Sequence, residues 1–131
     1  MNVNMLLWVE ELRSGKYRQG TGRLRDTDNK FCCLGVACDL FFRTTGKGRW
    51  VPQLETSSFT FMVDDNGSDV ALPKGVRDWL GLASASGGMK QRIHNGVTRQ
   101  SLTNINDDGV SFDEIANIIE SDIDQLIVDE A

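Results

Sequence analysis

A nearly continuous apolar segment, FCCLGVACDLFF, occupies residues 31–42. Its twelve residues fit a buried helix better than a strand, because buried strands usually run about four to eight residues. Gly35 lies inside this segment and costs a helix about 1 kcal/mol relative to alanine. We therefore expect a central buried helix over 31–42, with another backbone segment packed closely against Gly35.

Amphipathic helices are predicted on both sides of this segment. Residues 3–14 carry apolar side chains at helical spacing and end before Gly15, a residue typical of helix ends. Pro73 stands where a short helix ending at Gly81 would begin.

Two more helices are predicted toward the C-terminus. Residues 102–107 form a short candidate helix that ends before Gly109. Ser111 and Glu114 form a capping box, and a single apolar stripe then continues from Phe112 to Ile127.

Short strands complete the predicted fold. A strand beginning at 49–51 should stop at Pro52, and residues 59–63 predict a second strand followed by a polar turn at 64–68. Asn95-Gly96 predicts a hairpin within 89–100, and 16–25 is either a short strand or an ordered loop. The expected architecture is one α+β domain over 1–131, with three or four helices packed on a short antiparallel sheet.

Composition restricts the class of protein. The chain has 131 residues, of which 40% are hydrophobic and 25% charged, and its net charge is −5. These values are typical of one ordinary globular domain and argue against a general nucleic-acid coat or a polybasic membrane binder. No apolar run approaches the roughly 20 residues of a membrane span. The first residues, MNVN, have no basic signal-peptide region, so we expect a cytoplasmic protein.

The net charge conceals an asymmetry between two parts of the chain. Residues 1–50 hold nine bases and five acids, a balance of +4, whereas residues 51–131 hold five bases and fourteen acids, a balance of −9. One interpretation is a basic binding face and an acidic face that solubilises the protein or contacts another subunit. The other is a solvated acidic helix beside a loop that happens to be basic.

No metal, cofactor or catalytic site is predicted. The three cysteines, Cys32, Cys33 and Cys38, lie within an apolar run, where thiols are usually buried and inert. A structural zinc site needs four ligands, usually in two spaced pairs, whereas the chain offers this one cluster of cysteines and a single distant histidine, His94. Residues 104–114 resemble a calcium-binding EF-hand loop, but the glutamate falls one position early, so a capped turn is the better interpretation.

Several sequence blocks together resemble a known family. The blocks are Gln19-Gly20, Cys32-Cys33-Leu34-Gly35-Val36-x-Cys38-Asp39 and Asn106-Asp107-x-Gly109-x-Ser111-Phe112-x-x-Ile115-Ala116. The chain resembles, over nearly its whole length, a family of small uncharacterised proteins encoded by bacteriophages and some bacteria. The resemblance implies a phage accessory protein acting in the cytoplasm of a bacterial host, and it brings no assigned activity.

A basic segment is the main candidate for ligand binding. Residues 13–25 contain five bases, three glycines and one tyrosine, without an acid. Arginine forks match phosphate oxygens, glycines let backbone N–H groups approach an anion, and aromatic rings stack on bases. The predicted ligand-binding residues are Arg13, Lys16, Tyr17, Arg18, Arg23, Arg25 and Trp50. The alternative is a solvated hairpin whose arginines pair with the acidic C-terminal helix.

Three functions remain open from the sequence. The first is an anti-defence protein that binds and sequesters a small anionic ligand, of the nucleotide-signal class, without catalysis, in a homo-oligomer whose pocket lies between subunits. The second is an inhibitor that docks the acidic C-terminal helix on a host enzyme. The third is a nucleotide-cleaving enzyme, for which the sequence offers no recognisable constellation.

Overall fold

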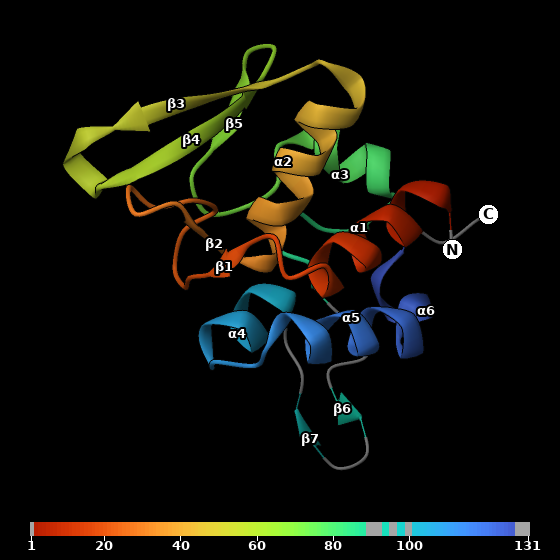
Figure 1. Ribbon diagram of the computed structural model, residues 1–131. Coiled ribbons are helices and arrows are strands. Elements are labelled where there is room, and N and C mark those ends of the chain that lie inside the picture. Colours follow the sequence, from red (N-terminus) through yellow and green to blue (C-terminus); the bar gives the residue numbers. More distant parts are fainter. Residues whose placement is uncertain (1, 89–92, 95–96, 99–100, 128–131) are drawn as a thin grey trace.

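The computed structural model describes residues 2–88, 93–94, 97–98 and 101–127, and these form an α+β fold (Figure 1). The helices are α1 (Val3–Arg13), α2 (Cys33–Thr45), α3 (Lys74–Leu80), α4 (Leu102–Asp107), α5 (Phe112–Ser121) and α6 (Ile123–Leu126), with a short 3-10 helix η1 (Leu54–Thr56). The strands are β1 (Arg18–Gln19), β2 (Lys30–Phe31), β3 (Arg49–Gln53), β4 (Ser58–Val63), β5 (Asn66–Ser68), β6 (Ile93–His94) and β7 (Val97–Thr98).

Helix α2 is the centre of the fold, as its apolar sequence predicted. The sheet β3–β4–β5 lies on one side of α2, and α4, α5 and α6 lie at the opposite end of the molecule (Figure 1). Eight residues of α2 are buried, including Gly35, and the backbone of Leu24 lies directly against that glycine. The predicted close approach at Gly35 is therefore confirmed. Phe31, which the apolar run assigned to the helix, instead belongs to β2 because its backbone pairs with that of Gln19.

Two of the sheets, β1–β2 and β3–β4–β5, meet around Phe31. β1 and β2 are parallel, with Gln19 opposite Phe31, and the chain also bridges Arg25 to Phe31 on the other side. The backbone N–H of Phe59 in β4 then donates to the carbonyl of Arg25 at 2.9 Å. Short extended segments from distant parts of the chain thus form one layer beside α2.

The predicted stop at Pro52 is wrong, because β3 continues through it to Gln53. Pro52 lies opposite Phe59 in the antiparallel register, and the N–H of Phe59 points away toward Arg25. Pro52 therefore occupies a pair without mutual hydrogen bonds, and the position of its missing N–H faces the free edge of the sheet, where proline is tolerated.

The predicted single C-terminal helix is divided at Asp122. The backbone of this buried residue has φ −113° and ψ 26°, outside helical geometry. After the break, α6 brings the carbonyl of Leu126 within 2.8 Å of the N–H of Ala83. Leu126 is fully buried. Tertiary packing therefore overrides the continuous periodicity of the sequence, which has no proline or glycine at this point.

The predicted hairpin near residue 95 is present as the antiparallel pair β6–β7, with His94 opposite Val97. Its predicted turn, Asn95-Gly96, lies outside the described residues. In the part of the chain that the structure describes, every helix is too short or too polar to cross a bilayer.

Removing the cap of α5 should destabilise the protein moderately. The Ser111 hydroxyl accepts a hydrogen bond from the N–H of Glu114 at 3.2 Å, as the sequence predicted. Ser111→Ala is expected to lower the free energy of unfolding by about 1 kcal/mol. Chemical denaturation measures this change. Ser121→Ala, at the exposed opposite end of the helix, is the matched control and should change stability by less than about 0.5 kcal/mol. Equal effects of the two substitutions would contradict the capping role.

Candidate ligand-binding site

Three of the seven predicted ligand-binding residues come together in the structure. Tyr17, Arg25 and Trp50 lie around Phe31, and Phe59 completes the group. We call these five residues the aromatic–arginine cluster. The rings of Tyr17 and Trp50 meet that of Phe31 edge-on, with centroid distances of 5.0 and 5.9 Å.

Strand register explains why the cluster forms. Phe31 is paired with Arg25, and Arg25 in turn lies next to Phe59. Side chains of directly paired residues lie on the same face of an extended layer. The Arg25 guanidinium consequently lies 4.1 Å from the ring centroid of Phe59 and 5.4 Å from that of Trp50.

Arg25 has a neutral hydrogen-bond partner. Its Nε and Nη2 atoms donate to Oδ1 of Asn29 at 3.0 and 2.7 Å. No ion pair joins Arg25 to any carboxylate of the described residues. A guanidinium on aromatic rings gains cation–π attraction, but its charge remains available to an anion.

A hydrogen-bonded network centred on Asp39 borders the cluster. Oδ2 of Asp39 accepts from the Tyr17 hydroxyl at 2.6 Å and from Nε of Arg43 at 3.2 Å, and Oδ1 accepts from Nε1 of Trp50 at 3.1 Å. Arg43 also pairs with Glu11 at 3.2 Å. Burial, followed by the hydrogen bond and charge of Asp39, raises the pKa of Tyr17 above its ordinary value.

The other four predicted residues lie away from the cluster. Arg13 pairs with Glu120 and donates to Asn117 at 2.6 Å, both on α5. Lys16 lies 3.6 Å from Glu11, Arg23 lies 2.9 Å from Asp69, and Arg18 is exposed in β1. The alternative interpretation, in which arginines pair with the acidic C-terminal helix, therefore describes Arg13.

Sequence analysis missed Asp39, Arg43, Phe59 and the central position of the buried Phe31 in the cluster. One signal was available: Asp39 is the one charged residue inside the apolar segment 31–42. A charge on a buried helix requires polar partners, so it should have predicted a network at that face. The partners themselves come from distant segments and carry no local signature.

The three cysteines are free and buried, as predicted. Burial raises the pKa of Cys32 to about 11 and also raises the pKa values of Cys33 and Cys38. A thiol with a raised pKa contains little thiolate near neutral pH and is a weak nucleophile.

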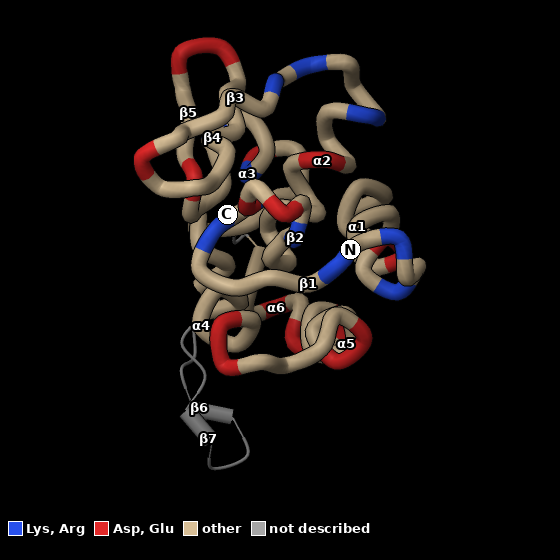
Figure 2. Tube along the Cα trace, turned by 60° about the vertical axis from the view of Figure 1, so that its left-hand side comes forward, with Lys and Arg blue, Asp and Glu red and all other residues tan. Residues whose placement is uncertain are grey.

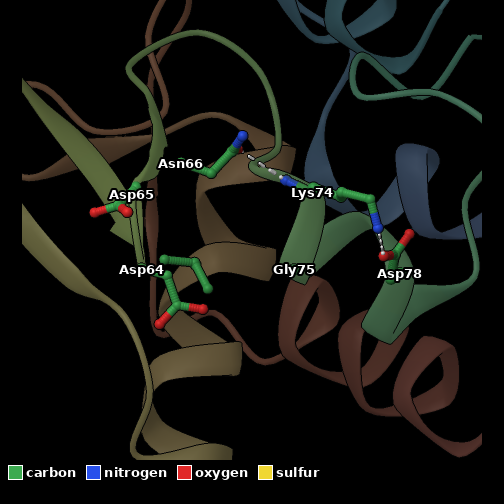
Figure 3. Close-up of a pocket in the computed structure, with 7 residues that line it drawn as sticks. Asp64, Asp65, Asn66, Lys74, Gly75 and Asp78 are labelled. Atoms are coloured by element: carbon green, nitrogen blue, oxygen red, sulfur yellow. Dashed lines mark hydrogen bonds and ion pairs between the residues drawn. The ribbon is translucent and has the colours of Figure 1, made fainter.

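A separate polar cleft of about 430 Å³ lies between the β4–β5 turn and α3 (Figure 3). Asp64 and Asp65 form the predicted turn on one side, and Lys74 pairs with Asp78 at 2.6 Å on the other. Asn66 links the two sides by accepting from the backbone N–H of Lys74 at 3.1 Å. None of the predicted ligand-binding residues lines this cleft. Within the described ranges, the structure gathers no three His, Cys, Asp or Glu side chains in a metal-binding arrangement.

The blocks that carry the family resemblance meet in a buried hydrogen-bonded network centred on Asn106. Oδ1 of the fully buried Asn106 accepts from Nε2 of Gln19 at 3.0 Å and from the N–H of Cys33 at 3.1 Å, while Nδ2 donates to the carbonyl of Gly20 at 2.8 Å. Gln19 in turn accepts from the N–H of Phe112 at 3.1 Å. The backbone carbonyl of Asn106 accepts from the N–H of Gly109 at 3.0 Å in the turn after α4, and its side chain adds long-range contacts that connect β1, α2 and α5.

The loop that resembles an EF-hand has a structural role in the turn between α4 and α5. The Asp107 carboxylate accepts from the N–H of Gly22 at 2.8 Å, Gly109 has a φ of +89°, and Ser111 caps α5. These features agree with the predicted capped turn.

Comparison with known families assigns the chain to one of them. The family DUF8296, described as a domain of unknown function, matches residues 2–123, and the chain belongs to it. No curated protein and no solved structure matches the chain.

Proposed function

We propose that this DUF8296 protein binds and sequesters a small anionic ligand that carries an aromatic ring, of the nucleotide class, at the aromatic–arginine cluster. The observation that carries the proposal is the position of Arg25, whose guanidinium lies 4.1 Å from the Phe59 ring centroid and beside Trp50 without an ion-pair partner among the described residues. A guanidinium binds phosphate oxygens, and an aromatic face stacks on a nucleobase.

The contrast with neighbouring arginines supports this choice. Arg13, Arg23 and Arg43 each face a carboxylate of the protein, so much of their charge is already compensated. Among the described residues, the hydrogen-bond partner of the Arg25 guanidinium is the amide oxygen of Asn29, which an anion could replace at the same guanidinium edge. Anion binding therefore requires no ion pair to be broken at Arg25.

Binding without turnover is the form of the proposal that the described chemistry favours. The thiols are buried with raised pKa values, and the carboxylates beside the cluster, Asp39 and Glu11, already hold Arg43. The setting proposed with it is that of a phage accessory protein in the bacterial cytoplasm, where such binding would remove a defence signal.

Removing either recognition group should weaken binding strongly. Isothermal titration calorimetry with a cyclic dinucleotide and with ADP-ribose should show binding to the native protein, and Trp50→Ala and Arg25→Ala should each reduce affinity about tenfold or more, since one stacked base contributes roughly 1–3 kcal/mol. Lys47→Ala removes an exposed cation outside the cluster and is the matched control. Absence of heat with every nucleotide, or cluster variants that bind as tightly as the native protein, would refute the proposal.

Recovery of the ligand distinguishes sequestration from cleavage. After incubation and denaturation of the protein, chromatography should return the nucleotide unchanged. Conversion to products would instead support the enzyme hypothesis.

A second candidate function rests on the acidic end of the molecule. Figure 2 shows Asp and Glu residues gathered on α4 and α5, and residues 102–127 contain no Lys or Arg. Asp108, Asp113 and Glu114 are exposed there. We propose as the alternative that this end docks on a basic groove of a host enzyme. Neutralising Asp108 and Asp113 should then abolish capture of one host protein, whereas neutralising Asp65 should not.

A further inference from the structure

We infer that Asp39 is the positioning residue of the aromatic–arginine cluster: its carboxylate holds the rings of Trp50 and Tyr17 in the orientation in which they receive a ligand. This inference rests on the proposed function, because it assigns a residue to the same surface.

The geometry places Asp39 between three donors from three segments. Its Oδ1 accepts from the indole N–H of Trp50 in β3, and its Oδ2 accepts from the hydroxyl of Tyr17, which precedes β1. Arg43, one turn later on α2, donates to Oδ2 and balances the charge. One carboxylate therefore connects both half-buried rings to the most deeply buried helix of the fold.

Hydrogen bonds add direction to the packing of these two rings. Both rings are partly exposed and meet Phe31 edge-on, and Trp50 also contacts Phe59 and Phe61. A directional hydrogen bond at the polar tip of each ring restricts its rotation further. The rings are thereby prepared before a ligand arrives, and a prepared surface binds at lower entropic cost.

The chemistry requires a carboxylate at this position. All three partners of Asp39 donate hydrogen atoms, and an ionised carboxylate offers acceptors only. The amide of asparagine would present its NH₂ group to at least one of these donors. Asp39→Asn thus removes positioning while it nearly preserves side-chain shape.

The test combines a ligand-independent and a ligand-dependent measurement on Asp39→Asn. Tyr17 is the single tyrosine of the chain, so the absorbance titration of tyrosine reports on it alone. Loss of the Asp39 carboxylate should shift this titration toward lower pH, because its hydrogen bond and charge both raise the Tyr17 pKa. Calorimetry with ADP-ribose should show affinity about three- to tenfold lower than that of the native protein. Asp28→Asn, an exposed aspartate outside the network, should change neither measurement.

One conservative variant tests the same assignment without altering charge. Trp50→Phe keeps an aromatic ring but loses the N–H. It should weaken ADP-ribose binding without shifting the absorbance titration of Tyr17. In the double variant with Asp39→Asn, the losses in affinity should be less than additive, because both changes break one interaction. Trp50→Phe alone keeps the inference testable if Asp39→Asn does not fold.

The two proposals fail in different ways. If the native protein binds none of the nucleotides, the proposed function is overturned. If the native protein binds ADP-ribose and Asp39→Asn binds it equally well with an unshifted Tyr17 titration, the positioning role is overturned and the site stands.

Discussion

Gly35→Ala should lower the free energy of unfolding by about 3 kcal/mol or more, enough to leave much of the protein unfolded under mild conditions. A Cβ atom on Gly35 would lie 1.8 Å from the carbonyl oxygen and 2.6 Å from the carbonyl carbon of Leu24. Both are backbone atoms, so no side-chain rotation can relieve the overlap. Helix propensity alone predicts the opposite sign, since alanine favours a helix by about 1 kcal/mol over glycine.

The backbone at Leu24 cannot retreat without losing other contacts. Its N–H donates to the carbonyl of Asp69 at 2.8 Å, and its carbonyl accepts from the N–H of Cys32 at 3.3 Å. The Leu24 side chain is fully buried. Moving this segment away from α2 would therefore break hydrogen bonds and open the core at the same time.

Urea denaturation followed by tryptophan fluorescence measures the loss. Gly15→Ala is an informative control, because Gly15 has a φ of +76° and open space around its position. Its cost should come only from the left-handed backbone, about 1–2 kcal/mol. A Gly35→Ala protein as stable as the native one would show that the close approach does not constrain the helix.

Asn106→Leu should lower the free energy of unfolding by about 3–5 kcal/mol. Leucine would leave the buried polar groups that now bond to Asn106 without hydrogen-bond partners, at roughly 1–3 kcal/mol for each group. The groups affected are the N–H of Cys33 at the start of α2, the carbonyl of Gly20 and the side-chain amide of Gln19. Asn106 has no exposed surface, so water cannot reach these groups without structural rearrangement.

A comparison within the same helix separates this loss from a general effect of substitution. Asn104 is exposed on α4, and Asn104→Leu should cost less than about 1 kcal/mol. The double substitution of Gln19 and Asn106 should show a coupling energy of about 0.5–3 kcal/mol, because the two amides share one network. If chemical denaturation showed equal losses of stability for the substitutions at positions 104 and 106, the structural role of the Asn106 network would be contradicted.

Gly35 and Asn106 show how much of the structure the local sequence pattern could predict. The apolar run predicted a buried helix and suggested a close neighbour for Gly35, and the structure identifies that neighbour as Leu24. The block containing Asn106 suggested a capped turn, which is present at Ser111. The long-range role of Asn106 was not predictable, because its partners lie 73 to 87 residues away in the chain.

The candidate site was predictable only in part, because its contacts also join residues that are distant in the sequence. Basic and aromatic residue types at Tyr17, Arg25 and Trp50 indicated anion and ring recognition, but they could not show which cations would be paired internally. The pairing of Arg13 depends on how α1 packs against α5, and the placement of Arg25 over Phe59 depends on which strands adjoin. Strand register is set by contacts distant in sequence.

The sequence by itself determined the α+β class, the buried central helix, the buried thiols and the cap of α5, because periodicity, burial preference and capping act over a few neighbouring residues. Only the tertiary structure decided that α2 begins after Phe31, that β3 passes through Pro52 and that the last helix divides at Asp122. It also decided that Asp39 joins Tyr17 and Trp50 at one surface. Each of these outcomes depends on partners brought together by chain folding, whose energies outweigh local propensities of about 1 kcal/mol or less.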